Sequence, residues 1–529
     1  MIRITLLILF VACMGIARGQ QVGIEGRVLD AQGQALPGVS VRIKGTSSGT
    51  LTNDKGNFSI RGSQNDVLVF FQIGMVQQEV VYKGQAIQVV LQSDDKQLEE
   101  VVVIGYQTVK KANLTGAVSI FKPDEMKNTI VTGTVGDALV TVPGVSVRSS
   151  GAPGSEGKVE IRGTGTFGNS NPLYVVDGVI SGANRDFNFN DIETIQVLKD
   201  ASAAAIYGSR AGNGVIIITT KKGKEGAMKV DVSSRFTTQW LPRYNLTDRD
   251  QWIKLNDLAF MNAIADGSTH NGLANHFGAN TNWQEEVFKN GSVQDHNISF
   301  SGGGKGSRYF ISGNYQGNTG TTIGTKSERF TLRSNTSASR DFGKDVKFTI
   351  GENIILSHFG VDQMDTNPIV DVYRMLPTIP IYDSRNWGGY GYGNNTYDIT
   401  FGSNPFAKED FTDTRNSNLR IRGNAFTELE VLKMFKYRFN FGFDFSNDRH
   451  RFLRKVGSWS ANQPQDPSSL TRNQGQSRDF VFDNTLEFNK TFGKHAISAV
   501  AGISFQPFMY EQVWGTKNGV LTNSLTGEY

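Results

Sequence analysis

The chain has 529 residues, and 54 basic residues against 50 acidic ones give it a net charge of +4. This length predicts more than one domain, and the near balance of charge argues against a nucleic-acid partner. Glycine is abundant at 59 residues while proline is scarce at 13, which favours a mainly β protein with many turns.

Residues 1–19 are predicted to be a secretory signal peptide. A basic residue precedes an apolar run over residues 4–16, and residues 17–19 give a small-x-small cleavage site. Cys13 is the single cysteine of the chain, so we expect neither disulfides nor thiol chemistry in the mature protein. A lipoprotein signal at Cys13 is the alternative, although Phe10 fits the third position before it poorly.

Residues 20–94 are predicted to form a small β-sandwich. Turn signals such as Pro37-Gly38 and Asn53-Asp54-Lys55-Gly56 separate short runs of strand-forming residues. Short strands at this spacing are typical of a sandwich. The predicted strands are residues 26–29, 39–43, 58–60, 67–71, 79–82 and 87–91.

A polar linker, residues 95–112, contains one run of strong strand formers. The run is Glu99, Glu100, Val101, Val102, Val103, Ile104 and Gly105. Soluble proteins usually cover an apolar strand edge, so a strand displayed in a linker predicts a partner protein that pairs with it. An ordinary strand that packs inside the following domain is the alternative.

Residues 113–225 are predicted to form a compact α+β domain. Its most informative stretch is residues 171–222, where an apolar strand ends at Asp177-Gly178 and two further strands follow. Between those two strands, Asp200 is a suitable N-cap and Gly208 a suitable stop for an alanine-rich turn of helix. The other predicted elements are a helix at 134–142 and strands at 159–163, 194–198 and 215–220.

Residues 226–529 alternate apolar and polar side chains in segments of about ten residues, which is typical of a transmembrane antiparallel β-barrel. The clearest segment, residues 435–446, has aromatic side chains on one face and polar or small ones on the other. A soluble β-sandwich is the alternative, but it does not explain aromatic residues along a whole strand face. Beyond residue 19 no apolar run approaches the roughly 20 residues that a transmembrane helix needs.

About ten strands are recognisable in this region, at roughly 30 residues per strand including loops. A barrel of that size is too narrow to hold a domain of more than a hundred residues, because plugged barrels have about 22 strands. The sequence therefore predicts a truncated barrel with about half of its strands, that is, an N-terminal fragment of a longer protein.

Two long polar insertions, residues 241–292 and 359–418, interrupt the barrel strands. The second contains Trp387, Tyr390 and Tyr392, whose rings would either pack within the loop or stack on the apolar faces of a ligand. The glycine-rich motifs elsewhere do not stand at a strand-to-helix turn, which a nucleotide site or a catalytic serine requires. The histidines lack the spacing of a zinc site. We therefore expect no enzyme, no cofactor and no metal.

Residues 171–222 resemble the plug-domain signature of SusC/RagA-type TonB-linked outer-membrane transporters. Residues 26–60 resemble the carboxypeptidase-regulatory-like extension that precedes many such plugs, and residues 98–106 resemble the TonB box. Arg162 and Lys199 stand where the family has cationic residues that can pair with barrel carboxylates, and solvated positions on the lumen wall are the alternative. The plug-motif residues are Arg162, Gly163, Asp177, Gly178, Lys199, Asp200, Tyr207, Gly208 and Arg210.

The resemblance implies an outer-membrane protein that imports a large nutrient by TonB-dependent transport, with the plug gating the barrel. An oligosaccharide or other glycan is the first expectation for the nutrient and a peptide the second. The expected partners are periplasmic TonB at the TonB box, a SusD-like surface lipoprotein, outer-membrane lipid and the oligomeric nutrient. An outer-membrane receptor or surface binding protein without transport is the alternative function.

Overall fold

The computed structural model describes residues 22–520, apart from 47, 73–74, 93–100, 105–106, 111–117, 124–134, 167, 182–186, 201–203, 268–277, 365–367, 394–399, 461–463 and 494. The predicted signal peptide and Glu99, Glu100 and Gly105 of the linker lie outside the described residues. The chain divides into two compact units, one over residues 1–101 and 110–112 and one over 102–109 and 113–529. Among the described helices, none is both long enough and apolar enough to cross a membrane.

The first unit is a sandwich of two sheets, as the spacing of its strands predicts. One sheet has the order β4-β1-β7 and the other β3-β2-β5-β6. Phe58 and Phe70 meet in the core with ring centroids 5.4 Å apart, and Ile24 and Leu68 are fully buried there. Each such side chain contributes about 1.5–3 kcal/mol by leaving water. The strands are β1 (Val22–Leu29), β2 (Ser40–Ile43), β3 (Gly49–Leu51), β4 (Asn57–Gly62), β5 (Val67–Phe71), β6 (Gln78–Val81) and β7 (Ile87–Val90).

The second unit contains a small α+β domain, called the plug domain below. Its main sheet has the order β10-β15-β16-β13-β14. Alternate residues of β16 are buried on opposite faces, Ile216 and Ile218 in one core and Val215 and Ile217 in the other, which explains its unbroken apolar run. The elements are β10 (Val118–Phe121), α2 (Val135–Leu139), β11 (Val145–Arg148), β12 (Lys158–Ile161), β13 (Leu173–Val176), β14 (Val179–Ser181), η3 (Phe189–Asp191), β15 (Ile192–Leu198), η4 (Ala205–Ala211) and β16 (Val215–Thr220).

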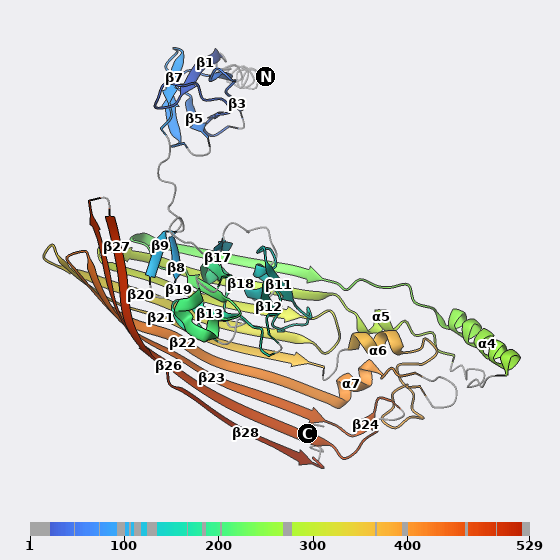
Figure 1. Ribbon diagram of the computed structural model, residues 1–529. Coiled ribbons are helices and arrows are strands. Elements are labelled where there is room, and N and C mark those ends of the chain that lie inside the picture. Colours follow the sequence, from blue (N-terminus) through green and yellow to red (C-terminus); the bar gives the residue numbers. More distant parts are fainter. Residues whose placement is uncertain are drawn as a thin grey trace, which may run out of the picture. The chain divides into compact units, whose positions relative to one another are not determined.

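The rest of the second unit is built on one antiparallel sheet of ten strands, called the wall sheet below. Its strands lie side by side in chain order from β17 to β26, followed by β27 and β28 (Figure 1). They are β17 (Gly226–Gln239), β18 (Gly291–Gly304), β19 (Ser307–Thr319), β20 (Lys326–Phe342), β21 (Val346–Gln363), β22 (Thr412–Val431), β23 (Phe435–Arg454), β26 (Ser469–Phe492), β27 (His495–Phe505) and β28 (Phe508–Asn518).

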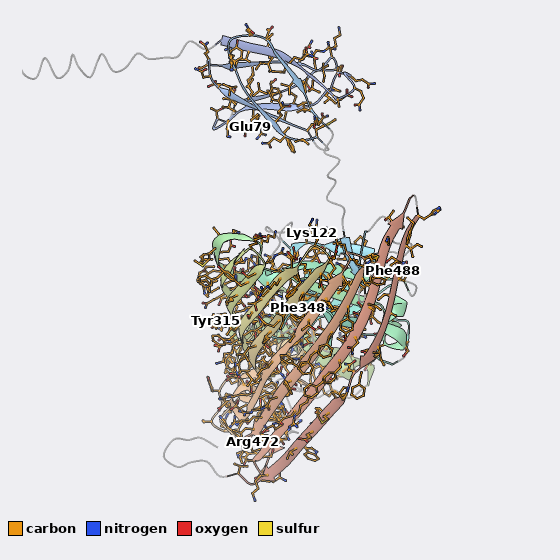
Figure 2. All side chains as sticks on the ribbon, turned by 90° about the vertical axis from the view of Figure 1, so that its left-hand side faces the viewer. Glu79, Lys122, Tyr315, Phe348, Arg472 and Phe488 are labelled. Carbon is orange, nitrogen blue, oxygen red and sulfur yellow. The ribbon has the colours of Figure 1, made fainter. Side chains whose placement is uncertain are left out.

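The wall sheet buries its polar face and exposes its apolar face. On β20, Arg333 is 1% exposed while the adjacent Leu332 is 55% exposed. Aromatic side chains lie on the same outward face of other strands, among them Tyr315, Phe348 and Phe488 (Figure 2). A water-soluble sandwich buries its apolar face instead, so this distribution fits a sheet whose outer face meets lipid.

The ten strands occupy nine positions in the wall sheet. β27 pairs with the second half of β26 and β28 with its first half, so the two lie end to end. The register is the same on both sides of the break, since Phe482 pairs with Phe505 and Asp479 with Phe508. The break falls at Pro507, which has no backbone N–H. Among the described strands, the sheet ends at β17 on one side and at β27 and β28 on the other.

The connections at the two ends of the wall sheet differ in length. One end has tight turns, residues 305–306, 343–345, 432–434 and 493–494, and the other has the long connections 240–290, 320–325, 364–411 and 455–468. Short turns of outer-membrane barrels face the periplasm and long loops face outward. The end with the long connections is therefore called the outer end below.

The long connections carry helices at the outer end, where α4 lies apart from α5, α6 and α7 (Figure 1). They are α4 (Arg249–Asp266), α5 (Trp283–Val287), α6 (Pro368–Arg374) and α7 (Pro405–Phe411), followed by the two-residue strands β24 (Gly457–Ser458) and β25 (Pro464–Gln465). The second insertion spans residues 364–411 and not 359–418, because β21 and β22 continue their pairing into the predicted loop.

Candidate functional site

The segment predicted to engage a partner strand is itself a strand. β8 (Val101–Ile104) pairs with β9 (Gln107–Lys110) in a two-stranded sheet. One edge of β8 is therefore occupied, because the polar residues that follow are also extended and supply a neighbour. A strand in a two-stranded sheet uses one edge for that neighbour and keeps the other edge for a further strand.

Asp177-Gly178 forms the tight turn of the hairpin β13–β14. Both residues have positive φ angles, +47° and +89°, which aspartate and glycine accept readily in such turns. The Asp177 carboxylate accepts hydrogen bonds from the backbone N–H of Thr220 at 3.0 Å and from its hydroxyl at 2.6 Å. These hydrogen bonds bind the turn to the end of β16. The sequence motif contains both segments but does not reveal this contact.

Arg162 and Lys199 make their contacts inside the plug domain. Arg162 has φ +57° and is followed by Gly163 at +88°, so β12 ends before it and not at Gly163 as predicted. Arg162 forms an ion pair with Asp200, and Lys199 donates to the carbonyl of Pro143. Burial, and then the charge of Arg162, lowers the pKa of Lys199. Among the described residues neither side chain is paired with a barrel carboxylate.

The alanine-rich segment is a kinked 3-10 helix. η4 continues to Ala211, and Gly208 inside it has φ +68° and ψ −156°, so this glycine interrupts the helix without ending it. Tyr207 packs against the core beside β16. Arg210 donates to Oε1 of Gln506 at 2.8 Å, which joins the plug domain to the wall sheet at the break between β27 and β28.

Glu160 is a buried anion in the plug domain that the sequence pattern did not single out. Its carboxylate meets Lys158 at 2.9 Å and Arg148 at 2.7 Å, and it accepts hydrogen bonds from Ser170 at 3.1 Å and Thr164 at 3.2 Å. Lys158 above all, then the two hydroxyls and Arg148, hold the pKa of Glu160 at about 2, although burial acts in the opposite direction. Lys158 and Thr164 are close to Glu160 in sequence, but Arg148 of β11 and Ser170 come from other segments, so the local pattern shows only part of this set.

Arg333 and Asn353 are wall-sheet residues that the sequence pattern also did not single out. Arg333 of β20 donates to the hydroxyl of Thr220 and, at 2.7 Å, to the carbonyl of Lys221. Asn353 of β21 donates to the Asp177 carboxylate. The hairpin turn and the end of β16 are therefore both held by the wall sheet.

Further contacts extend this plug–wall interface. Asn188 donates to Asn297 of β18 at 2.7 Å, and the Arg422 guanidinium of β22 lies 4.9 Å from the ring centroid of Phe187. Ile355 of β21 belongs to the apolar core of the plug domain. The plug domain thus packs against the polar inner face of the wall sheet with both polar and apolar side chains.

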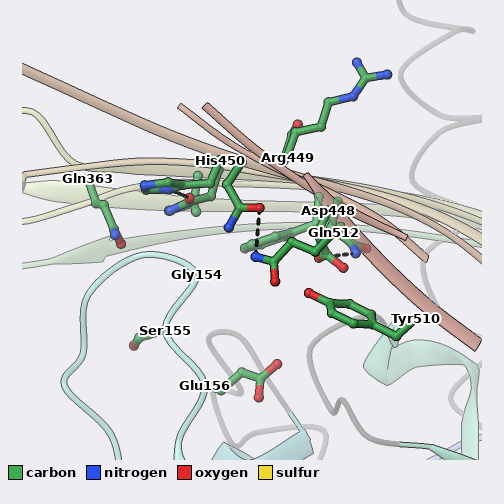
Figure 3. A pocket seen from close by; sticks show the side chains of 16 residues that line it. Gly154, Ser155, Glu156, Gln363, Asp448, Arg449, His450, Tyr510 and Gln512 are labelled. Atoms are coloured by element: carbon green, nitrogen blue, oxygen red, sulfur yellow. Dashed lines mark hydrogen bonds between the residues drawn. The ribbon is translucent and has the colours of Figure 1, made fainter. Parts of the chain in front are cut away.

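A cavity of about 490 Å³, called the outer cavity below, lies between the plug loop Gly154–Glu156 and the outer half of the wall sheet (Figure 3). Gln512 donates to Asn473 at 2.9 Å and Asn418 to Asp448 at 2.7 Å. The wall lining is rich in amides and hydroxyls and comprises Asn416, Ser417, Asn418, Asp448, Arg449, His450, Asn473, Tyr510 and Gln512, with Phe359, Val361, Gln363 and Gly475. Such a lining both donates and accepts hydrogen bonds, as a neutral polar ligand requires.

The predicted ligand loop lies at the outer end and does not line the outer cavity. Tyr390 donates to Asp410 at 3.0 Å and its ring lies 5.3 Å from that of Phe411. Burial, and then the charge of Asp410, raises the pKa of Tyr390. Tyr392 is half-buried, whereas Trp387 is 44% exposed. Packing therefore accounts for Tyr390, and a ligand contact by Trp387 stays a prediction.

Family models and curated relatives agree with this architecture. The TonB-dependent Receptor Plug Domain matches residues 110–215, and the CarboxypepD_reg-like domain matches residues 24–103. The TonB-dependent receptor P3 of Formosa agariphila is 32% identical over 552 residues, covering 99% of this chain and 52% of that protein. The TonB-dependent receptor SusC of Bacteroides thetaiotaomicron is 36% identical over 424 residues, covering 76% and 40%. The chain spans about half the length of the curated relatives it matches.

A solved structure shares the fold. The RagAB peptide importer in its open-open state superposes with a TM-score of 0.65 at 23% identity, covering 81% of this chain and 52% of that one. The predicted combination of extension, plug and partial barrel wall is therefore confirmed. The chain belongs to the TonB-dependent receptors of the SusC/RagA type.

Proposed function

We propose that the intact protein imports a large hydrophilic nutrient across the outer membrane and takes the energy for import from TonB. The observation that carries this proposal is the reversed burial of the wall sheet, in which Leu332 is exposed outward while Arg333 is buried against the plug domain. A sheet with that distribution faces lipid and encloses a polar interior. A domain that contacts the polar face is in place to control passage through that interior.

β8 is the proposed site of energy coupling. It lies in the linker between the N-terminal sandwich and the plug domain, where a periplasmic partner can add a strand to it. Strand pairing uses main-chain hydrogen bonds, which resist a pull without requiring a particular side chain. Beyond its hairpin neighbour β9, the next described strand along the chain is β10, an edge strand of the plug sheet, so a pull on β8 and β9 is delivered to that edge first.

The outer cavity supports an oligomeric polar nutrient, with a glycan first and a peptide second. Its amide and hydroxyl lining, with the ring of Tyr510, offers the hydrogen bonds and the aromatic surface that sugar rings use. The RagAB structure is that of a peptide importer, which keeps a peptide as the second candidate. The likeness to the SusC and RagAB proteins supports a SusD-like surface lipoprotein as the partner at the outer end.

Two proline substitutions test the coupling role of β8 in the intact protein expressed in cells. Successive N–H groups of a strand point to opposite edges, so one of Val102→Pro and Val103→Pro removes a donor from the edge that TonB would use. We expect that variant to lower nutrient uptake to the level seen in cells without TonB. Deletion of residues 98–105 should do the same and leave the protein assembled in the outer membrane.

Val102→Thr and Val103→Thr are the matched controls, because threonine keeps the β-branched side chain and the backbone donor. Uptake by the deletion variant at the wild-type, TonB-dependent rate would overturn the coupling role. Nutrient binding to cells without any TonB-dependent uptake by the wild type would favour a receptor or surface binding protein instead.

A further inference from the structure

Three arginines lie in one row across the wall sheet near its outer end. Arg451 of β23 is directly opposite Arg415 of β22 on one side and Arg472 of β26 on the other. Opposite residues of neighbouring strands have Cβ atoms about 4.5–5.5 Å apart, and like charges at that spacing destabilise a sheet. The row therefore favours an anion that neutralises it.

The side chains of this row are on the outward face, away from the plug domain. Residues two apart in a strand share a face, so Arg451 lies on the same face as the aromatic residues of β23. Although the adjacent Arg449 borders the outer cavity, its guanidinium points away from that cavity (Figure 3). Figure 2 shows Arg472 at the outer end of the face that also carries Phe348 and Phe488.

These arginines carry more positive charge than their acidic neighbour offsets. Asp413 pairs with Arg415 at 2.8 Å and also with Arg451. Arg449 and Arg472 are exposed, and neither has an ion-pair or hydrogen-bond partner among the described residues. Four arginines against one aspartate leave three positive charges without compensation. The five residues Asp413, Arg415, Arg449, Arg451 and Arg472 are called the arginine patch below.

The height of the patch above the apolar band decides which layer of the membrane it meets. The outward aromatic residues of β23 run from Phe435 to Phe445. At about 3.4 Å per residue and a strand tilt of about 40°, this run spans roughly 26 Å, close to the ~25 Å apolar band of outer-membrane barrels. By the same arithmetic Arg451 lies about 16 Å above the band.

That height excludes the head groups of ordinary phospholipids, which form a layer only about 5–8 Å thick on each side of the hydrocarbon core. In the outer leaflet of an outer membrane, the layer above this level consists of the saccharides of glycolipids. Arginine suits the anionic groups of such saccharides, because its planar guanidinium binds phosphate and carboxylate through two parallel hydrogen bonds. The unpaired Arg449 and Arg472 keep these donors available.

A cavity of about 500 Å³ adjoins the patch, since Asp413 and Arg415 are part of its lining. Lys326 and Asp362 also line it, and they pair with each other at 3.3 Å, so they add no net charge. The lining further includes the threonines Thr319, Thr325, Thr412 and Thr414. Sugar hydroxyls find both donors and acceptors in such a lining. A saccharide with an anionic group on the patch therefore has room for a neighbouring sugar.

We propose that the arginine patch binds the anionic saccharide of an outer-leaflet glycolipid. Phosphate or carboxylate groups of the saccharide lie on Arg449, Arg451 and Arg472, and a neighbouring sugar lies in the cavity beside Arg415. This inference requires a wall sheet that faces lipid, but it does not require import. It gives the outward face at the outer end a lipid ligand, separate from the nutrient on the inward face.

Binding of lipopolysaccharide from the host strain to the intact protein, purified in an uncharged detergent, tests the patch. Arg449→Gln combined with Arg472→Gln removes two positive charges and breaks no ion pair of the described residues. A basic residue near a membrane surface strengthens the binding of anionic lipid about fivefold. We therefore expect this double variant to bind lipopolysaccharide roughly 25-fold more weakly than the wild type.

The height of the patch is tested with lipid A, from which mild acid has removed the saccharide. Lipid A does not reach the patch, so the double variant and the wild type should bind it equally. An equally large loss of affinity for lipid A would place the contact at the acyl chains and overturn the assignment to the saccharide.

Arg340→Gln combined with Lys490→Gln is the matched control. Both residues lie on the outward face near the short turns, each beside an aromatic ring. The control therefore removes the same charge from the same face at its other end, and its affinity for lipopolysaccharide should equal that of the wild type. A similar loss in the control, or undiminished binding by the Arg449→Gln and Arg472→Gln variant, would overturn the proposal.

Two further outcomes would assign the patch to another ligand and so contradict the proposal. Complete displacement of lipopolysaccharide by inorganic phosphate, at a concentration matched to the lipopolysaccharide phosphate, would indicate a site for small anions. Loss of a co-purifying protein from the double variant, with unchanged lipopolysaccharide binding, would indicate a protein-docking surface. None of these measurements involves transport. A wild type that imports nothing but binds lipopolysaccharide through the patch would refute the proposed import and leave this inference standing.

Discussion

At the scale of single residues, the plug domain depends on a backbone position that suits glycine. Gly214 has φ +89°, and a Cβ added there would lie 2.7 Å from Cδ1 of Ile161 and 3.1 Å from the carbonyl oxygen of Leu198. Strain and crowding together should make Gly214→Ala lower the free energy of unfolding of the plug by about 1–3 kcal/mol. The urea midpoint of plug unfolding in detergent measures this change.

Gly212→Ala is the matched control for that substitution. Gly212 has φ −56°, and the nearest atom to an added Cβ is 3.5 Å away, so alanine fits without strain. We expect its urea midpoint to equal that of the wild type or to lie slightly above it. Equal midpoints for the alanine variants at 214 and 212 would contradict the prediction.

Glu160 should make the plug domain sensitive to acid. Its pKa of about 2 in the folded protein lies below the value of about 4.3 for an unfolded glutamate. The stabilisation by its ion pairs is therefore complete above about pH 4.3 and is lost as the pH falls from there toward 2. Glu160→Gln should lower the urea midpoint of plug unfolding at neutral pH. On acidification, its urea midpoint should fall less than that of the wild type.

An exposed glutamate of the same domain provides the comparison. Glu156 lies on the plug loop and is exposed, so Glu156→Gln should retain the acid sensitivity of the wild type. The urea midpoints of all three proteins are compared at neutral pH and at about pH 3, within the window over which Glu160 titrates. If the urea midpoints of Glu160→Gln and the wild type fall equally on acidification, another carboxylate causes the acid sensitivity.

Some residues of the candidate site could be predicted from the sequence, and others could not. Asp177-Gly178 is a local signal, because the turn geometry itself demands residues that accept positive φ. Arg333 gave no such signal, since a charged residue at an inward position of an alternating strand looks like any lumen residue. Its role depends on Thr220, which is distant in sequence and comes close only when the plug domain packs on the wall.

At the scale of elements, a buried ion pair holds two helices of the outer end together. Lys408 of α7 lies 2.6 Å from Asp371 of α6, with side chains only 11% and 9% exposed. Lys408→Met leaves Asp371 buried without its partner, which should destabilise this contact by about 3–5 kcal/mol. Proteolysis of the loop 364–411 on whole cells should accelerate accordingly.

The double variant separates the charge effect from simple loss of packing. Removing both charges with Lys408→Met and Asp371→Leu relieves the unpaired carboxylate, so we expect protease resistance to recover at least in part. Asp371 also accepts a hydrogen bond from the backbone N–H of Ser403 at 3.0 Å, so recovery should be incomplete. A double variant cleaved as fast as Lys408→Met would mean that packing around the pair, and not its charge, holds the helices.

Most elements were predictable because their patterns are local. Alternation over several residues specified the strands of the wall sheet and of the sandwich. Pairing depends on more distant residues, so the sequence does not identify β9 as the neighbour of β8, nor does it show that β21 and β22 continue to Gln363 and Thr412. Gly208 is predicted to end the helix, but η4 continues beyond it to Ala211, so the prediction of its end is wrong and the glycine only kinks the helix.

At the scale of the whole molecule, the reversed burial of the wall sheet predicts opposite responses to the same substitution on its two faces. Leu332 lies near the middle of β20 on the outward face, so Leu332→Arg should impair membrane assembly by about 2–4 kcal/mol. Ser233→Arg at the middle of β17 points inward by register with Asn297 and should be tolerated. The amount of heat-modifiable protein in the outer-membrane fraction measures assembly.

The opposite result would indicate a protein in water. Replacing an exposed leucine by arginine on a soluble protein is close to neutral. Equal assembly of Leu332→Arg and the wild type would therefore contradict a lipid-facing surface. The sequence could predict this polarity from alternation alone, but it could not say which strands the plug domain touches, because that depends on how two separately folded parts fit.

The proline between β27 and β28 has a mechanical consequence for the wall. The N–H of Phe480 donates to the carbonyl of Pro507 at 3.1 Å. Pro507 has no N–H to donate in return, so this residue pair has one backbone hydrogen bond instead of two. The strands on either side keep their register, and Arg210 binds at the neighbouring Gln506. The wall is therefore not uniformly stiff. Bending of the edge formed by β27 and β28 should concentrate at Pro507, next to the contact of Arg210 with Gln506.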